Sequence, residues 1–292
     1  PISADSELPF EQHRDIFHLT GIDQEETILL LYPPSKDDKT REILFIRKSD
    51  NHTKVWEGEK LSKKQANELS GIDSIYFIDD FKDILSSIAT KVDTFYINKN
   101  EHYRANSPVE TREDRFISWL LKKYPAHNVA KSNPILQRQR SIKHPDEIDQ
   151  IKKACDITRK GFNRVLEFIK PNVWEYEIEA EFIHEFINSS SKGFAYSPII
   201  ASGNDNNVLH YIKNNKQCKS GELILMDVGA EYGNYSSDMT RTVPVSGKFS
   251  KRQKEIYNAV LRVKNEATKL LTVGNNWKLF HDQVGDLSLI HI

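Results

Sequence analysis

The stretch Leu223-Ile-Leu-Met-Asp-Val-Gly-Ala-Glu-Tyr-Gly-Asn-Tyr-Ser-Ser-Asp-Met-Thr-Arg-Thr242 predicts how the second half of the chain folds. Two runs that favour β-structure flank the dipeptide Gly233-Asn234, which is typical of a two-residue hairpin turn. Such a turn places Tyr232 opposite Tyr235, and the pairing then continues outward along both strands. The sequence therefore predicts an antiparallel hairpin with a defined register.

This hairpin brings two carboxylates together. In the predicted register, Asp227 lies opposite Thr240, and Asp238 lies opposite Gly229. Because side chains alternate between the two faces of a strand, both aspartates emerge on the same face as diagonal neighbours. Their carboxylates are expected to lie roughly 5–8 Å apart.

Two neighbouring acids at this place need a partner. Asp227 ends the apolar run 223–226, and an unpaired buried carboxylate costs several kcal/mol. Divalent cations would satisfy both acids, and two-metal hydrolytic sites hold their ions about 3.5–4 Å apart. Carboxylates favour Mn²⁺ or Mg²⁺, with Zn²⁺ or Co²⁺ possible once an imidazole joins. The structural alternative is that one aspartate accepts hydrogen bonds in the turn and the other pairs with Arg241.

The composition is that of an ordinary globular protein of two domains. The 292 residues include 41 basic and 42 acidic side chains, for a net charge of −1. This balance gives no electrostatic reason to expect nucleic acid or an anionic membrane as a partner. No apolar stretch approaches the roughly 18–20 residues of a membrane helix. The two cysteines, Cys155 and Cys218, suit a reducing compartment, so a cytoplasmic location is expected.

Residues 1–135 are predicted to form the first domain. Short apolar runs alternate there with amphipathic segments, which is typical of an α/β layer structure. The stretch 124–141 is interpreted as a connector, because Pro125 and Pro134 are read as breakers. The strands are expected at 27–32, 42–47, 74–78 and 94–97, and the helices at 62–69, 81–88 and 110–123.

Residues 136–292 are predicted to form the second domain. Long amphipathic helices are expected at 145–170, 174–189 and 250–271, with a strand at 197–201. Ser250 and Gln253 form a capping box at the start of the third helix. Cys155 falls on the apolar stripe of the first of these helices, so it is expected in the core rather than at a reactive site.

The hairpin residues Asp227 to Thr242 resemble the metal-binding hairpin of the pita-bread metallopeptidases, and within them aminopeptidase P and prolidase. Three further segments are similar to the same family in the same order. They are the start of the N-terminal domain at Pro9 to Gly21, the entry to the catalytic domain at Arg140 to Ile151, and the substrate-side loop at Ala201 to Tyr211.

The resemblance implies a fold and a site. The fold would be an α/β N-terminal domain of the creatinase and aminopeptidase P type, followed by an α+β pita-bread domain. Asp227 and Asp238 would be two of five ligands to two divalent cations, with Mn²⁺ favoured, and Asp238 would bridge both ions. His210 would bind substrate or assist proton transfer. The reaction would release the N-terminal residue before proline, through a water activated by the two metals, and a homo-oligomer is implied by resemblance only.

The family pattern also requires a histidine and two glutamates after the hairpin. His281 lies in a stretch that reads as the start of a helix, and the tail Leu287 to Ile292 matches no family segment. The resemblance therefore implies a C-terminally truncated pita-bread domain, with an incomplete metal site and no activity of its own.

Two other functions stay open. Prolidase shares the site but cleaves dipeptides, and the segment Phe10 to Gly21 favours aminopeptidase P over it. A pita-bread module without catalysis, which binds peptides or proteins, is the alternative from a different class, and the intact acid pair disfavours it. A creatinase-like amidinohydrolase is disfavoured because that branch lacks the metal that both aspartates would bind.

Overall fold

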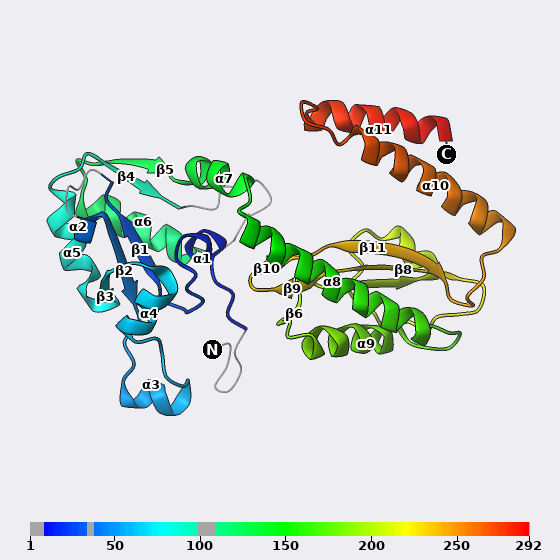
Figure 1. Ribbon diagram of the computed structural model, residues 1–292, viewed down its shortest axis with the longest axis horizontal. Coiled ribbons are helices and arrows are strands. Elements are labelled where there is room, and N and C mark those ends of the chain that lie inside the picture. The colour runs from blue at the N-terminus through cyan, green and yellow to red at the C-terminus, as the bar shows by residue number, and fades with distance from the viewer. Residues whose placement is uncertain (1–8, 34–37, 99–108, 292) are drawn as a thin grey trace. The chain divides into compact units, whose positions relative to one another are not determined.

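The structure of the protein, a computed structural model, describes residues 9–33, 38–98 and 109–291 (Figure 1). The chain divides into two compact units, Pro1–His144 and Pro145–Ile292, and each has its own hydrophobic core. The domain boundary expected between residues 135 and 136 stays a prediction. Within the described ranges, no helix combines the length and the hydropathy that a membrane crossing requires.

The first unit is an α/β domain built on a three-stranded sheet. The strand order is β1-β2-β3, in which β1 and β2 are antiparallel while β2 and β3 are parallel. A separate parallel pair joins β4 and β5. Parallel neighbours need crossover connections, which the helices between them provide. The elements are α1 (Arg14–Thr20), β1 (Ile28–Leu31), α2 (Asp38–Arg41), β2 (Glu42–Ile46), α3 (Asn51–Trp56), α4 (Lys63–Ser70), β3 (Ser74–Phe77), a 3₁₀ turn η1 (Ile78–Asp80), α5 (Phe81–Ala89), β4 (Thr94–Ile97), α6 (Arg112–Lys123), β5 (Asn128–Lys131) and α7 (Asn133–Ser141).

The expected connector at 124–141 is wrong. This stretch contains β5, which pairs with β4 over its whole length, and helix α7. Pro134 lies in the first turn of α7, where its missing N–H leaves no hydrogen bond unmade and its fixed φ suits the helix. A proline that breaks the interior of a helix is thus a favourable residue at its start.

The second unit places two helices on one face of an antiparallel sheet. Helices α8 and α9 lie along the sheet of order β11-β8-β7 (Figure 1). A shorter sheet of order β10-β9-β6 extends the same hairpin. The elements are α8 (Pro145–Phe168), α9 (Glu175–Asn188), β6 (Gly193–Phe194), β7 (Ile199–Ser202), a 3₁₀ turn η2 (Gly203–Asn207), β8 (Leu223–Val228), β9 (Ala230–Tyr232), β10 (Tyr235–Ser236), β11 (Met239–Pro244), α10 (Lys251–Leu270) and α11 (Trp277–His291).

Helices α10 and α11 pack against one another in an antiparallel pair (Figure 1). The capping box predicted from Ser250 and Gln253 is present at the start of α10. Helix α11 continues through the tail segment as far as His291, and Ile292 lies outside the described residues. His281 belongs to this helix, as the sequence indicates.

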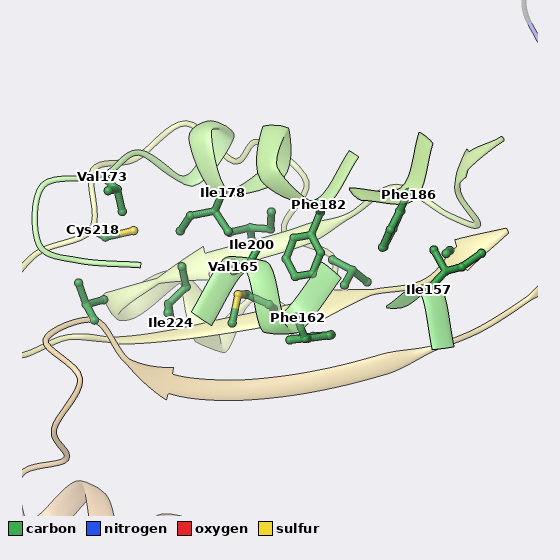
Figure 2. Packing of buried hydrophobic residues seen from close by; sticks show 14 residues of the cluster. Ile157, Phe162, Val165, Val173, Ile178, Phe182, Phe186, Ile200, Cys218 and Ile224 are labelled. Atoms are coloured by element: carbon green, nitrogen blue, oxygen red, sulfur yellow. The ribbon is translucent and has the colours of Figure 1, made fainter. Parts of the chain in front are cut away.

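The core of the second unit lies between the two long helices and the sheet. Figure 2 shows side chains of α8 and α9 meeting those of the strands. Every second residue of β8, namely Ile224, Met226 and Val228, is completely buried there. Because strand side chains alternate, Asp227 lies on the opposite face of the sheet, away from this core.

Cys155 is exposed, so the expectation that it belongs to the core is wrong. The buried stripe of α8 passes through Ala154, Ile157 and Thr158 instead. Ala154 and Thr158 are small enough to let the sheet approach closely, and they occupy the inner face in place of the thiol. The apolar character of Cys155 was therefore not enough to tell on which face of α8 it lies.

The hairpin has the predicted register. Tyr232 pairs with Tyr235, and Asp227 pairs with Thr240. Both turn residues have left-handed backbone angles, with φ of 58° at Gly233 and 65° at Asn234. Positive φ at both central positions is the requirement of a type I′ turn, which explains why the dipeptide Gly-Asn occupies it.

Gly229 marks a close approach of the two hairpin strands. A Cβ atom at this position would lie 1.9 Å from the carbonyl oxygen of Ser237. The backbone N–H and the hydroxyl of Ser237 both donate to the carbonyl of Ala230, each at 3.0 Å. Only glycine leaves room for this arrangement.

Replacing Gly229 with alanine is expected to lower the free energy of unfolding of the second unit by about 3 kcal/mol, because the backbone of Ser237 has to move. Urea unfolding followed by circular dichroism measures this change. Gly285→Ala is the matched control: a Cβ there meets nothing within 4 Å, so helix α11 should be unchanged or gain up to about 1 kcal/mol. Superimposable unfolding curves for Gly229→Ala and the unchanged protein would contradict the close approach.

Candidate metal centre

Two carboxylates and one phenol meet on the open face of the sheet. Asp227 lies in β8, and Asp238 directly precedes β11. The hydroxyl of Tyr196 lies 2.6 Å from Asp227 Oδ1 and 3.1 Å from Asp238 Oδ1, within hydrogen-bond distance of both. Because one hydroxyl reaches both carboxylates, the two Oδ1 atoms lie close to each other.

In the part of the chain that the structure describes, neither aspartate is neutralised by a lysine or arginine. Arg241, the partner considered in the structural alternative, donates from Nη1 to the carbonyl of Thr240 at 2.8 Å. Among the described residues, no salt bridge joins a lysine or arginine to Asp227 or Asp238. The structure does not support the reading that Arg241 accounts for Asp238.

Both aspartates line a cavity of about 470 Å³. His210 lines the same cavity, although it comes from the segment between η2 and β8, so the structure gathers all three residues singled out from the sequence. Ile199 and Ile212 supply apolar walls, and the remaining lining residues are Tyr196 and Ser197. The cavity thus combines a carboxylate pair, an exposed imidazole and an apolar wall.

Tyr196 is the residue of this centre that the sequence analysis missed. Burial, and then the hydrogen bond and charge of Asp227, raise the pKa of the Tyr196 phenol well above its usual value. The phenol is therefore un-ionised at neutral pH and has a single proton to donate. One proton cannot satisfy two carboxylates, so the pair retains free acceptor capacity toward the cavity.

The donor set fits a hard divalent cation. Carboxylate oxygens are the ligands that Mn²⁺ and Mg²⁺ prefer. This pair shares one phenol, and no described lysine or arginine forms a salt bridge with it. No group of three or more His, Cys, Asp or Glu side chains suited to a metal occurs in the part of the chain that the structure describes. Within the described residues, the acid pair is therefore a set of two carboxylates facing the cavity.

Comparison with known proteins places the chain among metallopeptidases. The sequence profile of metallopeptidase family M24 matches residues 149–287, and that of the aminopeptidase P N-terminal domain matches residues 1–96. Xaa-Pro aminopeptidases of Haemophilus influenzae and Escherichia coli are 32% and 31% identical over 96% and 94% of this chain. The chain spans 62% of the length of each of these relatives.

Solved structures agree with the sequence comparison. A putative aminopeptidase P from Bacillus anthracis superposes with a TM-score of 0.91 at 32% identity, over 99% of this chain and 68% of that one. Zinc-substituted aminopeptidase P from E. coli in complex with product gives 0.86 at 30% identity, over 99% and 66%. The fold and the acid pair define an M24 metallopeptidase domain behind an aminopeptidase P N-terminal domain. The chain belongs to the aminopeptidase P family.

Replacing Tyr196 with phenylalanine tests the shared hydrogen bond. Free tyrosines ionise near about pH 10, whereas the Tyr196 phenol should keep its proton through that range. The number of tyrosinates that absorb at 295 nm near this pH should therefore be the same in the Tyr196→Phe variant and the unchanged protein. A variant that lacks one tyrosinate in that range, while circular dichroism shows both proteins folded, would show that the phenol titrates freely.

Proposed function

We propose that the protein acts as a metal-dependent aminopeptidase, which releases the first residue of peptides that carry proline at the second position. The observation that carries this proposal is the Asp227 and Asp238 pair, which opens into the same cavity as His210. The names of the relatives support the substrate class, since the H. influenzae and E. coli proteins are Xaa-Pro aminopeptidases.

In this proposal the acid pair holds two divalent ions, with Mn²⁺ favoured by the oxygen ligands. When bound, such ions supply the acidity that lets water attack a carbonyl near neutral pH. Asp227 and Asp238 would hold the ions through their carboxylate oxygens. Tyr196 would keep the two carboxylates converged, because it is an outer partner of both.

The remaining cavity residues suit the peptide. His210 is exposed and would hydrogen-bond the substrate or hold a proton beside the scissile bond. Proline has no N–H and a fixed ring, so it needs an apolar surface rather than a hydrogen-bond acceptor. Ile199 and Ile212 supply such a surface within the same cavity. A cytoplasmic location and a homo-oligomeric state are part of the proposal.

The metal site can be tested without activity. We expect the 292-residue chain to bind Mn²⁺ with a dissociation constant weaker than about 10 μM by isothermal titration calorimetry, because two carboxylates are an incomplete ligand set. Asp227→Asn and Asp238→Asn should abolish this binding. Asp149→Asn, which alters an exposed acid on α8, is the matched control and should leave it unchanged. Tight binding by the chain alone, or binding that survives both substitutions, contradicts this assignment.

Cleavage is measured on the 292-residue chain and on the full-length gene product that contains it, which is called the active polypeptide if it cleaves. Peptides of two, three and five residues with proline or alanine at the second position are incubated with Mn²⁺, and release of the first residue is quantified. We expect release only before proline, and no release by the 292-residue chain alone. Either Asp→Asn variant of the active polypeptide should lower the cleavage rate by more than about 100-fold. The reason is that loss of even a residue that only hydrogen-bonds a metal ligand lowers activity by about 10- to 100-fold. Cleavage restricted to dipeptides would favour a prolidase, and cleavage of none of these peptides would reject a peptidase with this specificity.

A further inference from the structure

The segment that carries His210 has little core of its own. It runs from Val208 to Gln217, and of its side chains only Tyr211 and Asn214 are buried, with 7% and 3% of their surface exposed. His210 and Ile212 line the cavity from either side of Tyr211. Since so few apolar contacts hold this segment, polar contacts have to fix its position.

The Glu175 carboxylate provides two of these contacts. It is the first residue of α9, and none of its surface is exposed. Its Oε1 accepts hydrogen bonds from the backbone N–H and the hydroxyl of Ser202, at 2.8 and 2.7 Å. Its Oε2 accepts from the hydroxyl of Tyr211 at 2.8 Å and from the backbone N–H of Lys216 at 3.0 Å. One carboxylate therefore joins α9, β7 and two positions of the His210 segment, one next to His210 and one next to Gln217.

Only a carboxylate can make this set of contacts. Both of its oxygens accept, so four donors can be satisfied at once, whereas an amide accepts on one oxygen and presents N–H groups on the other side. Burial and the hydrogen bond to Glu175 raise the pKa of Tyr211 well above its usual value, so its hydroxyl is a donor at neutral pH. The four donors offset the cost of burying the Glu175 carboxylate without a salt bridge.

A second anchor holds the far side of the segment. Asn214 has a φ of 43°, and its Oδ1 accepts from the N–H of Ile200 at 3.0 Å. Its Nδ2 donates to the carbonyl of Pro198 and to Glu179. This anchor lies four residues beyond His210, whereas Tyr211 is its direct neighbour. Contact with Glu175 is thus the polar tie nearest to the imidazole.

We propose that Glu175 is a positioning residue, which fixes His210 at the cavity that the carboxylate pair lines by holding Tyr211, Lys216 and Ser202 in place. The effect on catalysis rests on the proposed peptidase function, whereas the effect on the segment does not. Glu175 is not among the residues that line the cavity, so its influence on the reaction would pass through His210.

Hydrogen exchange measured by mass spectrometry on the 292-residue chain tests the tie. Glu175→Gln should speed exchange at the amides of Ser202 and Lys216 by about 10- to 100-fold, because some of the four donors lose their acceptor. Glu177→Gln is the matched control. It makes the same chemical change two residues further along α9, where the carboxylate accepts a hydrogen bond from the backbone N–H of Trp174. It should leave both amides unchanged.

The catalytic consequence is measured on the active polypeptide. Measured where circular dichroism shows the variant folded, Glu175→Gln should lower kcat/KM for an Xaa-Pro peptide by about 10-fold or more, while its Mn²⁺ affinity stays close to that of Glu177→Gln. Its unfolding midpoint should also fall, because buried donors lose their acceptor. A role confined to stability would lower the midpoint and the metal affinity without a separate loss in kcat/KM. That outcome would overturn the positioning role.

Further outcomes are decisive. Equal exchange in the Glu175→Gln variant and the unchanged protein overturns the inference. If Glu175→Gln does not fold, Tyr211→Phe removes a single donor and should speed exchange several-fold at residues 208–213 but not at Ser202; no change there overturns the inference as well. If the unchanged polypeptide cleaves no Xaa-Pro peptide, the proposed function fails, and the exchange experiment still decides whether Glu175 holds the segment.

Discussion

The close contact between Gly229 and the carbonyl of Ser237 is the constraint on which the second unit depends. Around it, the hydroxyls of Thr158 and Ser237 lie 2.6 Å apart, and both are 2.9 Å from the backbone N–H of Ala230. Thr158 is completely buried on α8, so this contact fixes the helix and the hairpin to one another. A slip of one residue would move Asp227 to the core face now occupied by Val228. Such a slip is strongly disfavoured, because it would bury an unpaired charge.

This register also brings two carboxylates together without neutralising their charge. Two carboxylates share one phenolic proton, and among the described residues no cationic side chain reaches them. A structural role would be served better by a pair of apolar residues or by one acid and one base. A cation in the cavity would neutralise the repulsion between the two carboxylates. The geometry therefore supports a metal centre more strongly than the spacing of the two aspartates alone.

The local parts of the site could be predicted from sequence, and the non-local parts could not. The turn at Gly233-Asn234 and the alternation of strand side chains are local, so they were enough to place Asp227 and Asp238 on one face. Tyr196 reaches them through the pairing of β7 with β8, whose partners lie more than twenty residues apart. No pattern within either strand specifies that pairing. The same reason hides Glu175, which reads as an ordinary helix-start residue until the fold brings Tyr211 to it.

The two polar anchors of the His210 segment also explain why a charged residue is tolerated in the interior. Backbone hydrogen bonds join Glu175 with Lys216 and Val173 with Cys218, so they fix the end of the segment that leads into β8. They leave the end that carries His210 free to move with the exposed residues Val208 and Leu209. An apolar side chain in place of Glu175 would pack well against α9 but would leave four donors unsatisfied, at a cost of about 1–3 kcal/mol each. A carboxylate at this position satisfies all four donors, and one of them is the hydroxyl of Tyr211, the direct neighbour of His210.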